Sequence, residues 1–166
     1  MSEAPFRIKS LDAKHRRADF HCGTDALDSY FHTQVNQDMR RRVTACFVAL
    51  DATDEVAGFY TLASASVLLG DLPEITRKKL PRYPSVPVVR MGRLAVDTRF
   101  KGQGLGSALL ADALARCIQS EIAAYALLVN AKDSVAATFY EHHGFAPLPG
   151  DALCLFLPLA TAQKLV

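Results

Sequence analysis

A glycine-rich turn sets the strongest limit on what this chain can fold into. It carries three glycines at alternate positions, Gly102, Gly104 and Gly106. The apolar run Leu94–Val96 ends shortly before the turn, and a helical pattern of apolar residues starts at Leu105. Glycine permits backbone conformations that other residues avoid. Backbone N–H groups at such a strand-to-helix turn, the helix dipole and the Lys101 charge together favour a pyrophosphate. The sequence therefore predicts an α/β fold with an anion-binding turn.

Several kinds of phosphate-binding turn occupy this position between a strand and a helix. A Rossmann turn has the spacing G-x-G-x-x-G and an acid about 20 residues later. Here the spacing is G-x-G-x-G, and Glu121 stands too near. A P-loop has a lysine after its glycines, which this turn lacks. A coenzyme A pyrophosphate turn is our main interpretation, with a purely structural turn as the alternative.

Length and charge favour one domain with a local basic surface. The chain has 166 residues, of which 50% are hydrophobic, so we expect a single domain over residues 1–166. The formal net charge is +2, but residues 1–101 hold 16 of the 19 Lys and Arg and 12 of the 17 acids. A local basic patch can attract a polyanion even when the net charge is near zero.

Cysteines and apolar runs bear on the location of the protein. The four cysteines, Cys22, Cys46, Cys117 and Cys154, show no Cys-x-x-Cys or Cys/His ligand spacing. This argues against a zinc site or a disulfide framework. The sequence has no run of about 18 apolar residues and no basic-then-apolar leader. We therefore expect a cytoplasmic protein with no metal and no membrane partner.

Hydrophobic periodicity predicts alternating strands and helices. Strands are expected at 6–9, 44–50, 56–62, 88–96, 126–129, 145–148 and 154–157. Helices are expected after Thr24, within 71–80, from Leu105 to about Ser120, and after Asp133 or Ser134. The polar segment 51–55 predicts an antiparallel hairpin. The order strand, helix, strand around Leu105 predicts a parallel pair with a right-handed crossover.

Some details of these patterns are specific enough to test. The first helix should leave Asp28 off its apolar stripe. The last should carry Val135, Ala136, Phe139 and Tyr140 and end at Gly144. Gly92 inside the strand 88–96 suggests a bulge or a close backbone approach. Three prolines should keep the segment before residue 88 an extended loop: Pro81, Pro84 and Pro87.

The turn and several other motifs resemble a known family. Residues 94–110 resemble motif A of the GNAT family of N-acetyltransferases, written [QR]-x-x-G-x-[GA], with Lys101 in place of Gln or Arg. Further motifs are similar to the tRNA-acetylating toxins of type II toxin–antitoxin operons: Cys22-Gly23 before Leu27-Asp28, Gly58–Leu62, Leu80–Pro84, Gly92–Asp97, Asn130–Asp133, Ala137–Tyr140 and Gly144-Phe145. The resemblance implies a single-domain α/β fold with a mixed sheet of about six to seven strands flanked by helices.

The same resemblance implies acetyl-CoA as the cofactor and a backbone site for it. The backbone of Leu94, Ala95 and Val96 would hold the pantetheine and the thioester carbonyl. The pyrophosphate would lie on the turn residues Lys101, Gly102, Gln103, Gly104, Leu105, Gly106 and Ser107.

Three side chains complete the implied site. Tyr140 matches the family's general acid, which protonates the leaving coenzyme A sulfur; a core aromatic is the alternative. Asn130 would bind a pantetheine amide, with a turn residue as the alternative. Phe139 is counted with the cofactor-binding residues, although its side chain should face the core.

A missing residue bears on the acceptor amine. Many members of the family carry a Glu on the central strand as general base, but residues 88–96 contain no acid. A lysine side chain, with a pKa of about 10.4, needs help to lose its proton, whereas an α-amine near 7.7–8.0 does not. The sequence therefore favours an aminoacyl ester over a lysine as the acceptor.

A basic stretch agrees with a nucleic-acid substrate. Between Arg77 and Lys101 there are eight basic residues and one acid, Asp97. Six of them are predicted to contact tRNA: Arg77, Lys78, Lys79, Arg82, Arg90 and Arg93. Phosphate contacts of this kind supply affinity without reading sequence. An ordinary solvated surface is the alternative for any single one.

The sequence thus predicts a toxin that moves acetyl from acetyl-CoA to the α-amine of aminoacyl-tRNA and blocks translation. The resemblance implies a homodimer and a ribbon-helix-helix antitoxin, through which alone the protein would reach operator DNA. Two other functions stay open. One is an N-acetyltransferase of a small amine or a protein N-terminus, and the other is a regulatory module that binds antitoxin and operator with little catalysis.

Overall fold

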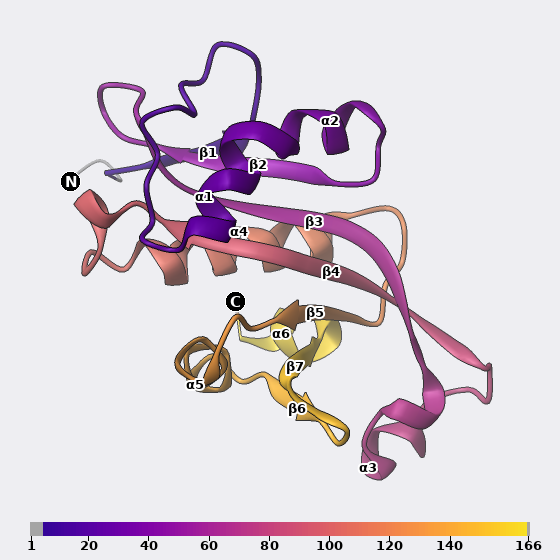
Figure 1. Ribbon diagram of the computed structural model, residues 1–166. Helices are drawn as coiled ribbons and strands as arrows, with labels where there is room; N and C mark the ends of the chain where they lie inside the picture. Colours follow the sequence, from indigo (N-terminus) through magenta and orange to yellow (C-terminus); the bar gives the residue numbers. More distant parts are fainter. Residues whose placement is uncertain (1–4, 166) are drawn as a thin grey trace. The chain divides into compact units, whose positions relative to one another are not determined.

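The computed structural model describes residues 5–165 of the chain. Within them, seven strands form one mixed sheet in the order β1-β2-β3-β4-β5-β7-β6 (Figure 1). The strands are β1 (Arg7–Ser10), β2 (Ala45–Leu50), β3 (Val56–Leu68), β4 (Ser85–Val96), β5 (Ala126–Asn130), β6 (Ala146–Leu148) and β7 (Asp151–Pro158). The α/β architecture and the sheet confirm the predicted fold class.

Helices connect the strands. The α-helices are α1 (Asp25–Ser29), α2 (Val35–Arg40), α3 (Glu74–Arg77), α4 (Leu105–Gln119), α5 (Ser134–His142) and α6 (Leu159–Lys164). A π-helix, η1 (Tyr30–Gln34), joins α1 to α2, and the 3-10 turns are η2 (Leu69–Asp71) and η3 (Thr98–Phe100). Sequence periodicity misses α6, because its buried residues Leu159 and Ala162 form too short a pattern.

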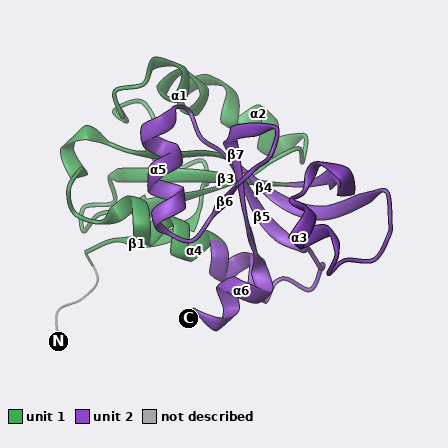
Figure 2. Cartoon of the chain, turned by 90° about the horizontal axis from the view of Figure 1, so that it is seen from below, with its two compact units in different colours: residues 1–63, 92–113 green, residues 64–91, 114–166 purple. Residues whose placement is uncertain are grey.

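The chain forms two compact units, each made of two stretches of sequence (Figure 2). Unit 1 comprises residues 1–63 and 92–113, and unit 2 comprises residues 64–91 and 114–166. The boundaries fall inside β3 and β4, so each of these strands contributes to both units.

Unit 1 is an antiparallel meander packed on aromatic side chains. β1 pairs with β2, and β2 pairs with β3, which confirms the predicted hairpin. Asp51 Oδ1 accepts hydrogen bonds from the N–H groups of Thr53 and Glu55, both at 2.9 Å, and so fixes the connecting loop. Phe31 stacks on Phe59 with ring centroids 4.3 Å apart, and Phe20 meets Phe59 edge-on at 5.4 Å.

The first helix buries a carboxylate that the pattern placed off the apolar stripe. Asp28 is only 6% exposed. Its Oδ1 accepts a hydrogen bond from Cys22 N at 2.8 Å, and its Oδ2 lies 2.9 Å from His21 Nδ1. Burial raises the pKa of Asp28, but the Cys22 hydrogen bonds and the His21 charge outweigh burial and hold this pKa below its usual value. The expectation for Asp28 was wrong because its carboxylate binds the preceding turn.

Unit 2 contains the parallel pair that the sequence predicts. β4 pairs with β5 in parallel, from Val88 opposite Ala126 to Met91 opposite Val129. β5 pairs with β7, and β7 with β6, both antiparallel. In Figure 1, α3 lies at the far end of the ribbon formed by β3 and β4.

One expectation for unit 2 was wrong. Pro87 belongs to β4, which begins at Ser85; proline can still accept a hydrogen bond, and Pro87 O receives one from Tyr125 N at 2.8 Å. In α5, Ala137 and Tyr140 are buried, whereas Val135 is 78% exposed. The predicted cap of α5 is confirmed: Asp133 Oδ1 accepts from Ala136 N at 2.8 Å.

Candidate functional site

Close packing of α4 on the sheet of unit 1 sets the position of the glycine turn. A Cβ at Gly58 of β3 would lie 2.9 Å from Leu109 Cδ1 and 3.0 Å from Ala95 O. Only glycine therefore lets α4 and the end of β4 approach β3 so closely. Leu105 and Leu109 are buried and hold the first turns of α4 in place.

The turn itself, residues 101–104, is exposed. Gly102 and Gly104 have φ values of +82° and +77°, in the left-handed region that favours glycine. A Cβ at either position would meet no heavy atom within 4 Å, so glycine is needed here for conformation rather than for space. The helix begins at Leu105, and the first N–H groups of a helix have no acceptor inside it. The arrangement offers donors and a positive helix end to an anion.

A buried carboxylate, Asp97, holds the segment before the turn. It is 1% exposed, and its Oδ1 accepts from Arg99 N at 2.9 Å and from Arg99 Nε at 3.0 Å. Its Oδ2 accepts from His21 N at 3.0 Å. Burial raises the pKa of Asp97, but the hydrogen bonds from Arg99 and His21 outweigh it and keep this pKa low. Asp97 therefore ties the end of β4 to the segment around His21, a role that sequence analysis missed.

Lys101 uses its ammonium within the protein. Its Nζ donates to Cys22 O at 2.9 Å, and Thr98 N donates to His21 O at 2.9 Å. The two bonds fasten the glycine turn to the segment 21–22. Any contact of Lys101 with a pyrophosphate would thus be made by its backbone and by a charge that is already hydrogen-bonded.

The strand before the turn has one core residue among the three predicted to bind the cofactor. Ala95 is 6% exposed, whereas Leu94 and Val96 are half-buried. β4 runs unbroken through Gly92, where a Cβ would lie 3.5 Å from Thr61 Oγ1, an ordinary contact. Space does not explain this glycine, and the bulge stays a prediction.

Tyr140, on α5 of unit 2, has a buried hydroxyl with a weak partner. The side chain is 5% exposed, and its ring meets those of Phe139 and Phe145 edge-on at 5.2 and 5.6 Å. The hydroxyl lies 3.9 Å from Met91 Sδ, and a thioether is a poor acceptor. Burial raises the pKa of Tyr140, so the phenol stays protonated at neutral pH. This hydroxyl can therefore donate a proton to a stronger acceptor.

The two other predicted side chains lie in different environments. Phe139 is half-buried, with its ring 4.9 Å from that of His143, so the deeper of the two adjacent aromatics is Tyr140. Asn130 is the last residue of β5 and is exposed.

The predicted tRNA-binding residues have different local partners. Unit 1 contains Arg93, and unit 2 contains Arg77, Lys78, Lys79, Arg82 and Arg90. Arg77 Nη1 donates to Gly70 O at 3.4 Å, and Lys78 Nζ lies 3.5 Å from Glu74 Oε1. Arg93 instead stacks on an aromatic ring, with its Cζ 3.4 Å from the centroid of Tyr30.

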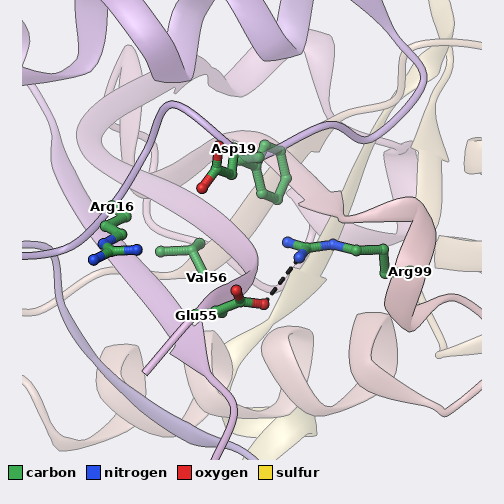
Figure 3. Close-up of a pocket in the computed structure, with 6 residues that line it drawn as sticks. Arg16, Asp19, Glu55, Val56 and Arg99 are labelled. Carbon is green, nitrogen blue, oxygen red and sulfur yellow. Dashed lines mark hydrogen bonds and ion pairs between the residues drawn. The ribbon is translucent and has the colours of Figure 1, made fainter. Parts of the chain in front are cut away.

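Unit 1 also contains a small pocket beside Arg99 (Figure 3). Its lining consists of Arg16, Asp19, Phe20, Glu55, Val56 and Arg99. Arg99 Nη1 donates to Glu55 Oε2 at 2.9 Å across it, as the dashed line in Figure 3 shows. Its volume of about 10 Å³ suits one water molecule at most, so it is no cofactor site.

Two features are absent from residues 5–165. No group of three or more His, Cys, Asp or Glu side chains there is placed to hold a metal ion. None of the helices in that range is long and apolar enough to cross a membrane.

Comparison with known proteins assigns the family. The sequence profile of the acetyltransferase (GNAT) domain matches residues 19–153. The chain belongs to the GNAT acetyltransferase family. This confirms the family resemblance drawn from the glycine turn.

Named GNAT relatives match the chain over nearly its whole length. The tRNA-acetylating toxin of Mycobacterium tuberculosis (strain ATCC 25618 / H37Rv) is 38% identical over 165 residues, which cover 98% of this chain and 96% of that protein. The structure of AtaT complexed with acetyl-methionyl-tRNAfMet has a TM-score of 0.89 and 32% identity, covering 96% of this chain and 98% of that one. The structure of AtaTR bound with AcCoA has a TM-score of 0.84 and 30% identity, covering 97% and 98%.

Two further structures show AtaT with other partners. One is an AtaT variant bound to the C-terminus of the antitoxin AtaR, with a TM-score of 0.82 and 26% identity, covering 98% of both chains. The other is the AtaT–AtaR complex bound to DNA, with a TM-score of 0.78 and 28% identity, covering 96% of this chain and 98% of that one.

Proposed function

We propose that this GNAT protein is a toxin that transfers the acetyl group of acetyl-CoA to the α-amine of an aminoacyl-tRNA and thereby blocks translation. The observation that carries the proposal is the 38% identity to a tRNA-acetylating toxin over 98% of the chain. A cytoplasmic location is part of the proposal, because charged tRNAs serve translation there.

The glycine turn fits the pyrophosphate of the cofactor. The left-handed backbone at Gly102 and Gly104, open on the outside, and the start of α4 at Leu105 supply outward donors and a positive helix end. We assign the cofactor to residues 94–96, residues 101–107, Asn130 and Phe139. Acetyl-CoA supplies the activated acetyl thioester; the chain supplies binding and orientation.

Tyr140 is the general acid in this proposal. Formation of the amide bond would break the carbon–sulfur bond; the nitrogen would lose one proton to water, and the coenzyme A sulfur would gain one from the Tyr140 hydroxyl. The Tyr140 hydroxyl is protonated at neutral pH, as any tyrosine with a pKa of about 10 or higher is, and its partner, Met91 Sδ, competes only weakly for the proton. An α-amine, unlike a lysine, needs no carboxylate on β4 to become neutral at pH 7–8.

Basic side chains attract the tRNA. Arg82 and Lys79 are exposed around α3, with Arg90 exposed on β4, and a phosphate contact by each adds affinity without sequence reading. Arg77, Lys78 and Arg93 complete the proposed set.

The direct test uses radiolabelled acetyl-CoA with a mixture of charged tRNAs. We expect label on the esterified amino acid, none on uncharged tRNA, and a strong reduction with Tyr140→Phe. Absence of transfer to every charged tRNA in the mixture would reject the proposed substrate. Equal transfer by Tyr140→Phe would remove this residue from its role.

Two other functions predict different results in the same assay. An acetyltransferase of a small amine or a protein N-terminus would label polyamines or peptides and leave charged tRNA unlabelled. A regulatory module with little catalysis would label nothing.

The proposed regulation involves two protein partners. We propose a homodimer that a ribbon-helix-helix antitoxin neutralises and links to operator DNA; AtaT bound to AtaR and to DNA supports this regulation. Light scattering on the purified protein tests the dimer. Operator binding that needs no antitoxin would contradict the proposed link.

A further inference from the structure

The basic side chains on and after β4 in unit 1 differ in whether their donors are already used. Arg99 donates to Asp97 and Glu55, and Lys101 donates to Cys22 O. Arg93 is half-buried, with its Cζ 3.4 Å from the centroid of the Tyr30 ring, and its positive charge helps to lower the pKa of Asp38. Its guanidinium makes no hydrogen bond or ion pair to any residue in the range 5–165. Arg93 is thus held in place while its N–H edge stays available.

The π-helix η1 aligns the groups that hold Tyr30. Tyr30 OH donates to Asp38 Oδ2 at 2.8 Å, eight residues further along the chain. In a regular α-helix with about 3.6 residues per turn, two turns bring the seventh residue into line. A π-turn contains an extra residue, which brings the eighth into line instead.

Neighbouring hydrogen bonds keep this arrangement fixed. Gln34 Nε2 donates to Asp38 Oδ1 at 3.1 Å, so both Asp38 oxygens already have donors other than Arg93. Arg17 Nη1 donates to the η1 carbonyls of Phe31 and His32, at 2.9 and 3.3 Å. The Tyr30 ring is therefore a rigid platform for the guanidinium.

A guanidinium on such a platform suits a phosphate. One face is covered by the ring through a cation–π contact, and the planar N–H fork can bind two oxygens of a phosphodiester. Partial burial reduces screening by salt and strengthens the attraction.

The place of Arg93 separates it from the cofactor's phosphates. Arg93 lies three positions before Val96, the end of β4, which corresponds to about 10 Å of strand before the glycine turn begins. We propose that Arg93 binds a backbone phosphate at the acceptor end of the charged tRNA, and that Tyr30 and Asp38 position it. The inference rests on the proposed function, whose substrate site it makes specific.

The experiment measures steady-state acetylation by the full chain with each substrate varied in turn. For Arg93→Met we expect KM for charged tRNA to rise about tenfold, and the salt dependence of tRNA binding to lose about one unit of slope. KM for acetyl-CoA should change less than about twofold. Arg93→Lys keeps the charge but not the fork, and should raise the tRNA KM about threefold.

Positioning variants and a charge control sharpen the result. Tyr30→Leu removes the platform and should raise the tRNA KM, whereas Tyr30→Phe keeps the ring and should have a smaller effect. Arg7→Met removes one positive charge from β1, where Arg7 pairs with exposed Asp54, and should leave the tRNA KM within about twofold. Thermal unfolding of each variant shows whether it is folded.

Three outcomes would overturn the inference. An equal KM rise for Arg7→Met and Arg93→Met would mean that only total charge matters. A rise confined to the acetyl-CoA KM would assign the anion to the cofactor. If the unaltered protein acetylates no charged tRNA, the proposed function fails by itself. Filter binding of charged tRNA then tests Arg93 separately. Equal affinities of the unaltered protein and Arg93→Met for charged tRNA would reject the phosphate site.

Discussion

Asp97 of unit 1 and Tyr140 of unit 2 are both polar and almost fully buried, at 1% and 5% exposure, but their partners differ. The Asp97 carboxylate accepts four hydrogen bonds, from His21 N and from three nitrogens of Arg99. The Tyr140 hydroxyl has a sulfur 3.9 Å away. A buried polar group with all its partners stabilises a fold, whereas one with a weak partner costs stability and stays available for chemistry.

The largest expected effect concerns the catalytic role of the Tyr140 hydroxyl. Tyr140→Phe should lower kcat for acetyl transfer by about 10²–10⁴, the range for loss of a general acid. The thermal midpoint should stay nearly constant, because no strong hydrogen bond is lost. Kinetics and calorimetry on the same preparation measure both. Tyr125→Phe, which removes the hydroxyl of a half-buried tyrosine of unit 2, is the control and should keep its rate.

The next largest effect concerns the contribution of the Asp97 carboxylate to stability. Asp97→Asn replaces acceptor oxygen by an amide that faces donors, and should cost about 3 kcal/mol of the free energy of unfolding. For a chain of this size that corresponds to a thermal midpoint about 6–12 °C lower. Asp54→Asn, at an exposed ion pair with Arg7, should change it by less than about 0.5 kcal/mol. Equal losses of unfolding free energy in Asp97→Asn and Asp54→Asn would mean that the Asp97 hydrogen bonds contribute no more to stability than an exposed ion pair.

The stability of the protein should depend on pH, because the pKa values of two buried carboxylates are lower in the folded state. The folded-state pKa values of Asp97 and Asp28 lie below the usual value, so their stabilisation is fully present above about pH 4 and is lost as pH falls through the lower folded values. Urea midpoints should therefore fall as the pH is lowered below about 4. Asp97→Asn should flatten this decline; an unchanged slope would contradict the assignment.

The smallest expected effect tests whether the glycine turn, which follows Asp97 in the chain, binds the cofactor. Gly104→Ala puts a side chain at a φ of +77°, at a strain of about 1 kcal/mol, and should raise KM for acetyl-CoA several-fold. Gly150→Ala is the control, since that position has neither a positive φ nor a heavy atom within 4 Å of an added Cβ. Equal acetyl-CoA KM values for the two variants would remove the turn from the cofactor site.

Local patterns predicted the fold where periodicity and turn residues agree. The hairpin around 51–55, the parallel pair of β4 and β5, and the Asp133 cap were all visible in the sequence. Failures came where a tertiary partner overrides the pattern. Asp28 is buried because Cys22 N reaches it, and Pro87 joins a strand because only its carbonyl is needed there.

The candidate site was predicted less completely than the fold. Glycine spacing indicated the turn, but nothing in the spacing shows that Lys101 would donate to Cys22 O, 79 residues away in sequence. Tyr140 could be picked out by resemblance, yet the weakness of its hydroxyl contact emerges only from the folded chain. Tyr30 and Asp38 escaped detection because a separation of eight residues does not repeat in an α-helix.

The π-helix makes the length of one segment a constraint in its own right. Deleting one residue between Tyr30 and Asp38 would let α1, η1 and α2 join as one regular α-helix, with the Asp38 side chain seven positions after Tyr30 and again in line with it. Winding the full-length segment as a regular α-helix would instead rotate α2 by about 100° about its axis and take Asp38 away from Tyr30. The extra residue is therefore compatible with the Tyr30–Asp38 hydrogen bond only because the π-turn absorbs it.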